Sequence, residues 1–267
     1  MNSLAIIGAG NLGLAIAKGA SNKGIFAPAD IILTRRNLGK IESWKVSGYN
    51  LTNNNCEAVE HARIIVISVQ PKQVAGLLAE IADRLDVNRH ILVSVVTGVT
   101  TDEIHAGLGN KPVPVVRAMP NTAVAIAESM TCMCARHTTD EQLAEVKRLF
   151  DSLGKTLVVE ERLMKAATVL AASGVAFFMR YLRAATQGGI QLGFDAEDAQ
   201  AIAVQTAKGA ATLLQLNGSH PEMEIDKVTT PEGCTIAGLN EMEHQGLSSA
   251  LIKGILTSFE KINNIRK

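Results

Sequence analysis

The sequence predicts an α/β fold in which an N-terminal doubly wound, Rossmann-type parallel sheet is followed by an all-α domain. Two observations predict this fold. Short runs of β-branched residues alternate with amphipathic stretches over residues 1–160, which is typical of parallel strands covered by helices on both faces. From Glu161 onward the strand pattern ends, and long Ala-rich stretches with helical periodicity take its place. We therefore expect two domains, residues 1–160 and residues 161–267.

The apolar runs of the first domain predict strands in the chain order LAIIG, DIILT, RIIVISV, HILVSVV, VPVVRAM and SMTCMCA. Amphipathic segments between them predict helices up to about Lys23, near residues 38–46 and over residues 71–85. The second domain repeats the helical pattern in MKAATVLAASGVAFFMRYLRAATQGGIQLG, in DAEDAQAIAVQTAKGAATLLQL and in the tail from Thr235. The first domain should therefore carry a sheet and the second only helices.

Composition narrows the classes of partner. The chain has 267 residues, and its 26 Lys and Arg residues balance 26 Asp and Glu residues, so we expect a small-molecule ligand rather than a nucleic acid or an acidic membrane. The first residues lack a charged segment typical of a signal peptide, and no uncharged apolar run approaches the roughly 20 residues that span a bilayer. These features predict a cytoplasmic protein.

The four cysteines, at positions 56, 132, 134 and 234, form no CxxC pair and have no histidine at zinc-ligand spacing. We therefore expect reduced, structural cysteines and no metal site.

The motif GAGNLG follows the first predicted strand and opens the first predicted helix. Gly8 would allow a tight turn, Gly10 would let a pyrophosphate approach the backbone, and Gly13 would let helix and strand pack closely. Asn11 and Leu12 lie at the helix start, which faces the phosphates in such folds. A glycine-rich turn can be only a turn, but this position in a βαβ pattern predicts a dinucleotide site.

The end of the second predicted strand indicates which dinucleotide. It reads ILTRRN, with Thr34, Arg35 and Arg36 where an NAD-specific site would place an acidic residue. Two guanidiniums and a hydroxyl can clamp a 2′-phosphate through charge-assisted hydrogen bonds. We expect NADPH to be preferred, with NADH possible; the alternative is that Arg35 and Arg36 form a solvated turn.

Two further strands end in polar segments, SVQP and SVVTG. Because the carboxyl ends of parallel strands form the ligand crevice of such sheets, Val69, Gln70 and Pro71 should flank the cofactor. Ordinary turns would have the same composition, so spacing alone does not separate the two interpretations.

Two loops complete the pattern. RAMPNT, residues 117–122, is either a wall of the nicotinamide pocket that includes Asn121 or only an Asx-type turn. DKVTTPEGCTIAGL, residues 226–239, begins a helix at a proline surrounded by threonines. Such a helix start attracts an anion.

The order GAGNLG, SVQP, RAMPNT, LAASG and VTTPEGCTIAGL over the full chain resembles the pyrroline-5-carboxylate reductase family. RAMPNT is similar to the family's R-x-M-P-N-T-P, and VTTPEGCTIAGL to its V-T-S-P-G-G-T-T-I-A-G-L. The resemblance implies NADPH-dependent reduction of 1-pyrroline-5-carboxylate to proline by hydride transfer to a cyclic imine. It also implies that the all-α domain is a dimerisation domain and that the protein is a homodimer or a ring of dimers.

The resemblance also assigns residues. Thr230, Gly233, Cys234 and Thr235 would hold the carboxylate of the substrate, and Thr235 would hydrogen-bond the ring nitrogen as the candidate catalytic residue. The alternative for Thr235 is a helix cap. Asn55 matches an asparagine near the adenine ribose, and the alternative for it is a helix N-cap.

Several positions depart from the family pattern. Gln70 replaces a lysine, Ala123 replaces a proline, and Glu232 replaces a glycine beside the predicted carboxylate site, where a negative charge would repel the substrate unless it points to solvent. These changes keep open a non-catalytic NADPH-binding sensor or partner protein on the same fold. A third alternative is an NADP-dependent small hydroxy-acid dehydrogenase, for which Lys165 would be the acid-base residue.

Overall fold

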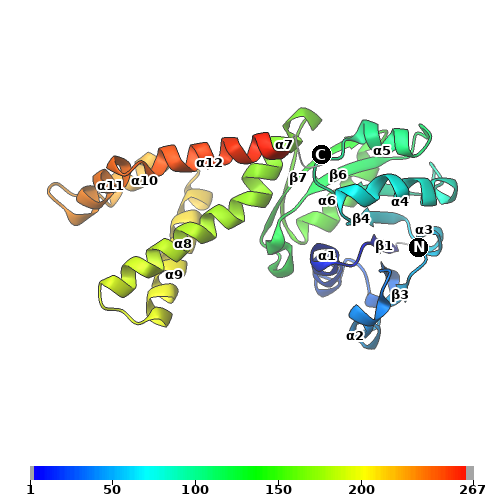
Figure 1. Cartoon of the computed structure of the whole chain (residues 1–267), viewed down its shortest axis with the longest axis horizontal. Helices are drawn as coiled ribbons and strands as arrows, with labels where there is room; N and C mark the ends of the chain where they lie inside the picture. Colours follow the sequence, from blue (N-terminus) through cyan, green and yellow to red (C-terminus); the bar gives the residue numbers. More distant parts are fainter. Residues whose placement is uncertain (1–2, 263–267) are drawn as a thin grey trace. The chain divides into compact units, whose positions relative to one another are not determined.

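The computed structural model describes residues 3–262 and contains one eight-stranded sheet (Figure 1). Its strands are β1 (Leu4–Ile7), β2 (Ile31–Thr34), β3 (Asn50–Thr52), β4 (Ile64–Ile67), β5 (Ile91–Ser94), β6 (Val115–Met119), β7 (Ser129–Arg136) and β8 (Gly154–Val158). The α-helices between them are α1 (Asn11–Asn22), α2 (Glu42–Val46), α3 (Asn55–His61), α4 (Val74–Ile81), α5 (Thr101–Gly107) and α6 (Asp140–Asp151). The predicted alternation of strands and helices is confirmed.

The strand order is β3-β2-β1-β4-β5-β6-β7-β8, and six of the seven strand pairs are parallel. Only β7 runs antiparallel to its neighbour β6, which the alternating pattern of SMTCMCA does not specify. The order reverses between β1 and β4, so the loops after these two strands border the crevice in which such sheets bind ligands. The doubly wound fold class is therefore confirmed.

Strands β1, β4, β5 and β6 are buried at every residue, which explains why they read as continuous apolar runs. Leu4 and Ile6 of β1 pack into a cluster with residues of α1 and α6, whereas Ala5 and Ile7 pack into a second cluster with α3, α4 and α5. Figure 1 shows these two helix groups on the sheet. Alternate residues of one strand thus face two different layers, and the carboxyl edge of the sheet is left for a ligand.

The residues after β8 are helical throughout the described range. They form α7 (Met164–Ala167), a π-helical segment (Thr168–Ser173), α8 (Gly174–Gln191), α9 (Ala196–Asn217), α10 (Pro221–Lys227), α11 (Cys234–His244) and α12 (Leu247–Ile262). Short 3-10 turns elsewhere are η1 (Pro28–Asp30), η2 (Leu38–Lys40), η3 (Pro71–Gln73), η4 (Ala82–Arg84), η5 (Thr122–Ile126) and η6 (Glu161–Leu163). As the sequence predicts, residues 161–262 contain no strand.

The chain divides into two compact units. Unit 1 consists of Met1–Ser173 with Ser258–Lys267, and unit 2 of Gly174–Thr257. The change from strands to helices occurs before the first of these limits, between β8 and η6. The predicted domain boundary between residues 160 and 161 stays a prediction.

Candidate functional site

The loop after β1 has the backbone geometry that a dinucleotide requires. Gly8 has φ +96°, and a Cβ there would lie 2.5 Å from the carbonyl oxygen of Ser68. A Cβ on Gly13 would lie 2.8 Å from Cγ2 of Ile6, so helix α1 can approach β1 only without a side chain. A Cβ on Gly10 would meet nothing within 4 Å, which leaves room beside the helix start for a phosphate group.

A cleft of about 570 Å³ opens in front of this loop at the carboxyl edge of the sheet. It is bordered by the segments after β1, β2 and β4 and by one face of α4. The residues that line it are Ile7, Gly8, Ala9, Gly10, Thr34, Arg35, Arg36, Asn37, Lys40, Asn53, Asn55, Ser68, Val69, Gln70, Gln73, Gly76, Leu77 and Glu80. The cleft has the size of a ligand pocket, and its glycine loop and cations fit a phosphate-bearing nucleotide.

Three cationic side chains gather at the β2 side of the cleft. Arg35 is half-buried and its Nη1 donates to the carbonyl oxygen of Ala9 at 2.9 Å, so the guanidinium lies against the glycine-rich loop. Arg36 and Lys40 are exposed and line the same cleft. This charge distribution suits a phosphate monoester near the end of β2.

A hydrogen bond joins Thr34 and Asn55, which both line the cleft. Thr34 is 2% exposed, and its hydroxyl donates to Oδ1 of Asn55 at 2.8 Å. The cap of α3 is Asn54, whose side chain accepts from Glu57 N, so the alternative that Asn55 is the N-cap is wrong. With its hydrogen given to Asn55, the Thr34 hydroxyl can act toward a ligand only as an acceptor, and its predicted donation to a 2′-phosphate is not available in this arrangement.

The structure brings part of the predicted cofactor set together in the cleft. Val69 and Gln70 line it together with Gly8, Gly10, Thr34, Arg35, Arg36 and Asn55. Five other predicted residues lie outside the lining, namely Asn11, Leu12, Gly13, Pro71 and Asn121. Gly13 serves packing beneath the loop, as its close approach to Ile6 shows. The contacts of all these residues with a nucleotide stay predictions.

Asn121 forms the Asx-type turn that the sequence left as an alternative. Its Oδ1 accepts from Ala123 N at 2.9 Å, and its Nδ2 donates to the carbonyl oxygen of Ala171 at 3.1 Å. Ala171 belongs to the π-helical segment, whose wider winding frees carbonyl groups from the usual i→i+4 pattern. The RAMPNT loop is therefore fastened to the helix that continues into α8.

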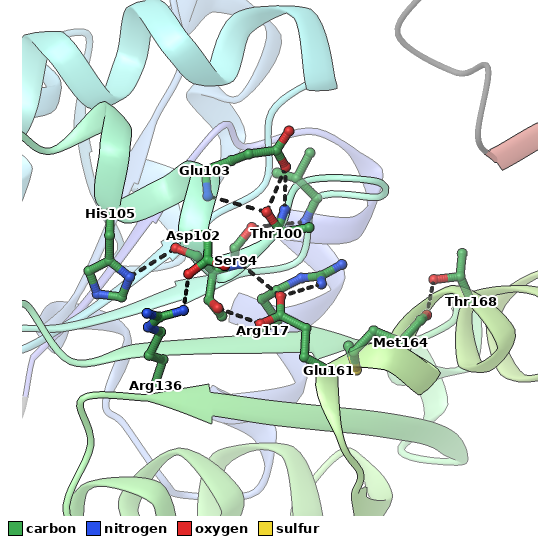
Figure 2. Close-up of polar contacts among 12 residues, drawn as sticks. Ser94, Thr100, Asp102, Glu103, His105, Arg117, Arg136, Glu161, Met164 and Thr168 are labelled. Atoms are coloured by element: carbon green, nitrogen blue, oxygen red, sulfur yellow. Dashed lines mark hydrogen bonds and ion pairs between the residues drawn. The ribbon is translucent and has the colours of Figure 1, made fainter. Parts of the chain in front are cut away.

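The arginine of RAMPNT does not line the cleft but is buried and forms an ion pair with a half-buried glutamate. Arg117, 4% exposed, donates through Nη1 to Glu161 Oε1 at 2.8 Å (Figure 2). Glu161 also accepts from Thr101 N at 2.8 Å and from the Thr101 hydroxyl at the start of α5. Burial alone would raise the pKa of Glu161, but the hydrogen bonds from Thr101 and Arg117 outweigh it and lower that pKa. The carboxylate thus ties β6, α5 and η6 together as an anion.

Cys134 pairs with Arg117 across β6 and β7 and is buried. Burial raises the pKa of its thiol to about 11. The thiol is therefore protonated at neutral pH and acts as a small packing group, as expected for a structural cysteine.

The second predicted site, before α11, differs in detail from expectation. The helix begins at Cys234, with Gly233 as its cap, and not at Pro231. Gly233 N donates to Thr230 O at 3.0 Å, so residues 230–233 form a β-turn with the proline in its second position. This hydrogen bond occupies the N–H of Gly233, and the assignment of Gly233 to the carboxylate site stays a prediction. The free N–H groups of the first helical turn belong to Cys234, Thr235 and the next residue.

Glu232 occupies the third position of this turn with φ +58°, a left-handed conformation. That position favours glycine in a turn of this kind, which explains why the family pattern has glycine there. The side chain is exposed. The departure at Glu232 is thus a matter of backbone conformation as well as of charge.

The sequence does not single out Lys40, Gln73 and Glu80, although all three line the cleft. The sequence pattern does mark two of them, Gln73 and Glu80. Residues 73, 76, 77 and 80 recur at helical spacing and form the cleft-facing side of α4 and the turn before it. Their polar members, Gln73 and Glu80, interrupt an otherwise apolar helix, and this could have marked a ligand-facing edge.

Within residues 3–262, no group of three His, Cys, Asp or Glu side chains is placed to hold a metal ion. Cys56, Cys132, Cys134 and Cys234 are free thiols. Lys165 lies exposed on α7 and is not part of the cleft lining.

Two family models match the chain. Residues 161–265 match the model described as pyrroline-5-carboxylate reductase dimerisation, and residues 3–98 match NADP oxidoreductase coenzyme F420-dependent. Pyrroline-5-carboxylate reductase 2 of Dictyostelium discoideum is 46% identical over 97% of this chain and 91% of its own length. Pyrroline-5-carboxylate reductase 1 of the same organism is 50% identical over 97% of this chain, but the chain spans only 49% of that longer relative.

Solved structures agree with the fold. The Coxiella burnetii pyrroline-5-carboxylate reductase is 26% identical, with a TM-score of 0.90 over 99% of this chain and 98% of that chain. The Plasmodium falciparum pyrroline carboxylate reductase, solved with NADP bound, has a TM-score of 0.90 at 22% identity and covers 100% of this chain and 98% of that one. Because the Plasmodium falciparum structure is only 22% identical, its similarity supports the fold alone.

Proposed function

The chain belongs to the pyrroline-5-carboxylate reductase family, and from that membership we propose that it reduces 1-pyrroline-5-carboxylate to proline with NADPH. One observation supports this most: the chain carries two anion-accepting helix starts, each with a glycine-containing turn. The first, at α1, opens into the cationic cleft, and the second, at α11, has Thr230 in its turn and Thr235 in its first helical turn.

The proposed cofactor is NADPH, with NADH as a weaker alternative. When bound, the nicotinamide supplies the hydride, and the protein supplies position and electrostatics. Gly8 and Gly10 would admit the pyrophosphate, while Arg35, Arg36 and Lys40 would face a 2′-phosphate. Replacing Arg35 and Arg36 by Ala should raise the KM for NADPH much more than that for NADH. Equal effects on both would contradict the phosphate clamp.

The proposed substrate site is the start of α11. The N–H groups of Cys234 and Thr235 would hold the carboxylate, with the exposed hydroxyl of Thr230 beside them. The Thr235 side chain is half-buried in the first helical turn, and we assign it the hydrogen bond to the ring nitrogen of the imine. Among the described residues, no histidine or cysteine lines the nucleotide cleft. Catalysis would then rest on positioning the cofactor and the imine next to each other.

The proposed assembly is a homodimer or a ring of dimers built on the helical unit. Of residues 174–257 only Thr186, Ala199 and Ala207 are buried, while large apolar side chains are exposed. The exposed set in this range is Phe178, Met179, Tyr181, Ile190, Leu192, Phe194, Ile202, Val204, Leu213, Leu216, Met223, Val228, Met242, Leu247, Leu251, Ile252 and Leu256. Soluble monomers rarely expose so much apolar surface, so we assign a second copy of this chain as its cover.

The helical stretch Glu161–Gln191 is long and apolar enough to cross a membrane by length and composition, with mean hydropathy 1.3 over its most apolar window and 17% of that window buried. The sequence expectation concerned uncharged runs, and Lys165 and Arg180 interrupt this stretch before an uncharged run reaches about 20 residues. Arg180 and Arg183 lie within the stretch, and guanidiniums are costly at the centre of a bilayer. We therefore propose a protein partner for this surface and a cytoplasmic location.

The proposal is tested by incubating the purified protein with NADPH and 1-pyrroline-5-carboxylate and following the loss of nicotinamide absorbance. We expect turnover that Thr235→Ala reduces through kcat while nucleotide affinity stays unchanged. Thr212→Ala is the matched control, because its hydroxyl donates to Lys208 O within α9. Full activity of Thr235→Ala would remove the assigned hydrogen bond. Nucleotide binding without any turnover would favour the sensor.

A further inference from the structure

A carboxylate lies in the nucleotide cleft although the sequence places no acid at the end of β2. Glu80, in the last turn of α4, lines the cleft together with Arg35, Arg36 and Lys40. In NAD-binding sheets an acid after the second strand accepts from the ribose hydroxyls. Here an acid reaches the same cleft from a different element.

Glu80 is joined to the glycine-rich loop by a chain of hydrogen bonds. Gly8 N donates to the Thr34 hydroxyl at 3.4 Å, and this hydroxyl donates to Asn55 Oδ1 at 2.8 Å. Asn55 Nδ2 then donates to Glu80 Oε1 at 3.2 Å and to Oε2 at 3.1 Å. Each link connects a different segment of the cleft wall, so the orientation of Asn55 depends on both of its neighbours.

The chemistry of the groups fixes the direction of this chain. An ionised carboxylate only accepts hydrogen bonds, so the Nδ2 side of Asn55 must face Glu80 and the Oδ1 side must face Thr34. Without Glu80 the amide would lose the partner that holds its donor end. Glu80 is therefore placed to affect a ligand in two ways, through its own charge and through the orientation of Asn55.

We propose that Glu80 is a specificity-determining residue of the nucleotide site, which limits the preference for the 2′-phosphorylated cofactor and positions Asn55. Three cations favour a 2′-phosphate, and the carboxylate opposes it while offering an acceptor to a free ribose hydroxyl. Both cofactor forms can then bind, with the phosphorylated form ahead. This inference rests on the proposed function only in that the cleft binds a nicotinamide dinucleotide.

Two substitutions separate the two effects. Glu80→Gln removes the charge but keeps an oxygen that accepts from Asn55, whereas Glu80→Ala removes both. We expect Glu80→Gln to raise affinity for NADP⁺ about threefold to tenfold, the scale of one unit charge several ångström away in a solvated cleft, and to leave NAD⁺ affinity within about twofold. Glu80→Ala should weaken the binding of NAD⁺ by about threefold or more, because Asn55 is no longer held.

The measurement is calorimetric titration of the full-length protein with NADP⁺ and NAD⁺, and with 2′,5′-ADP and 5′-AMP as fragments that differ at the 2′ position. Asp83→Asn is the matched control, since it makes the same charge change just after α4 on a side chain that is 98% exposed and does not line the cleft. It should leave every affinity within twofold. The gain in Glu80→Gln should shrink at high salt, as expected for a charge effect.

The outcomes are distinct. An NADP⁺ to NAD⁺ affinity ratio in Glu80→Gln within twofold of the unsubstituted protein would overturn the charge role. Identical NAD⁺ affinities in Glu80→Ala and Glu80→Gln would overturn the positioning role. Failure of the unsubstituted protein to bind either dinucleotide would instead overturn the proposed function.

Discussion

Removing the carboxylate of Glu161 should destabilise the protein far more than removing its neighbour in sequence. Glu161 accepts from Arg117 and from both donors of Thr101, and the Arg117 side chain is only 5% exposed. Glu161→Ala would leave a guanidinium buried without its counter-ion, in a place where Arg117 Nε already lacks a hydrogen-bond partner among the described residues.

The magnitude follows from the burial of the two partners. Breaking a fully buried ion pair by deleting one member costs about 3–5 kcal/mol. Because the Glu161 side chain is 33% exposed, water can reach part of the space that it leaves, and we expect about 2–3 kcal/mol. For a chain of this size that corresponds to a fall in Tm of roughly 5–10 °C.

The matched control is Glu160→Ala. The Glu160 side chain is 67% exposed, and the side chain of its ion-pair partner Arg162 is 71% exposed. Exposed pairs contribute little, so this variant should lie within about 0.5 kcal/mol of the parent. A double variant, Arg117→Met with Glu161→Leu, should recover part of the loss because no unpaired charge remains.

Urea unfolding followed by circular dichroism would measure these differences, at one fixed protomer concentration because assembly contributes to stability. A loss in Glu161→Ala no larger than that in Glu160→Ala would refute the reasoning. Equal losses in Glu161→Ala and in the double variant would show that packing, rather than the charge of Arg117, sets the cost.

Three further predictions concern pH, the α11 turn and the glycine loop. Because the folded-state pKa of Glu161 is lowered, its carboxylate should stabilise the folded protein fully above the unfolded pKa of about 4.3, and this stabilisation should be lost as pH falls through the folded pKa. A Glu161→Gln variant should lack this part of the acid transition. Glu232→Gly should raise the free energy of unfolding by about 0.5–1 kcal/mol by relieving φ +58°, and a lower urea midpoint would contradict it. Gly8→Ala should destabilise the protein by about 2 kcal/mol or more, because its Cβ would lie 2.5 Å from Ser68 O. Gly10→Ala should keep the Tm of the unsubstituted protein and lose NADP⁺ affinity. Equal Tm values in the two variants would count against the loop geometry.

Local patterns sufficed for the fold class because most strands carry their own apolar run, but β3 and β8, two strands with exposed residues, were not among the predicted strands. The order of apolar runs and the change after Glu161 predict the sheet and the helices that follow, and the φ of +96° at Gly8 is the conformation that its motif demands. The antiparallel β7 and the π-helical turn depend on tertiary packing, which no window of sequence reports.

The candidate site was predictable where it follows strand ends and not where it depends on contacts between distant elements. Arg35 and Arg36 come directly after β2, and their sequence position places them at the cleft. Glu80 joins them only because α4 packs beside α3, and Asn54 rather than Asn55 caps α3 because of one hydrogen bond to Glu57 N. Such choices between neighbouring polar residues are decided by geometry, not by residue type.

The most direct test of the account is a crystal structure of the protein with NADP⁺ and proline bound together. We predict the proline carboxylate against the N–H groups of Cys234 and Thr235, with the Thr235 hydroxyl at the ring nitrogen and the pyrophosphate at Gly10. Residues 230–235 turned away from the bound amino acid would contradict the account.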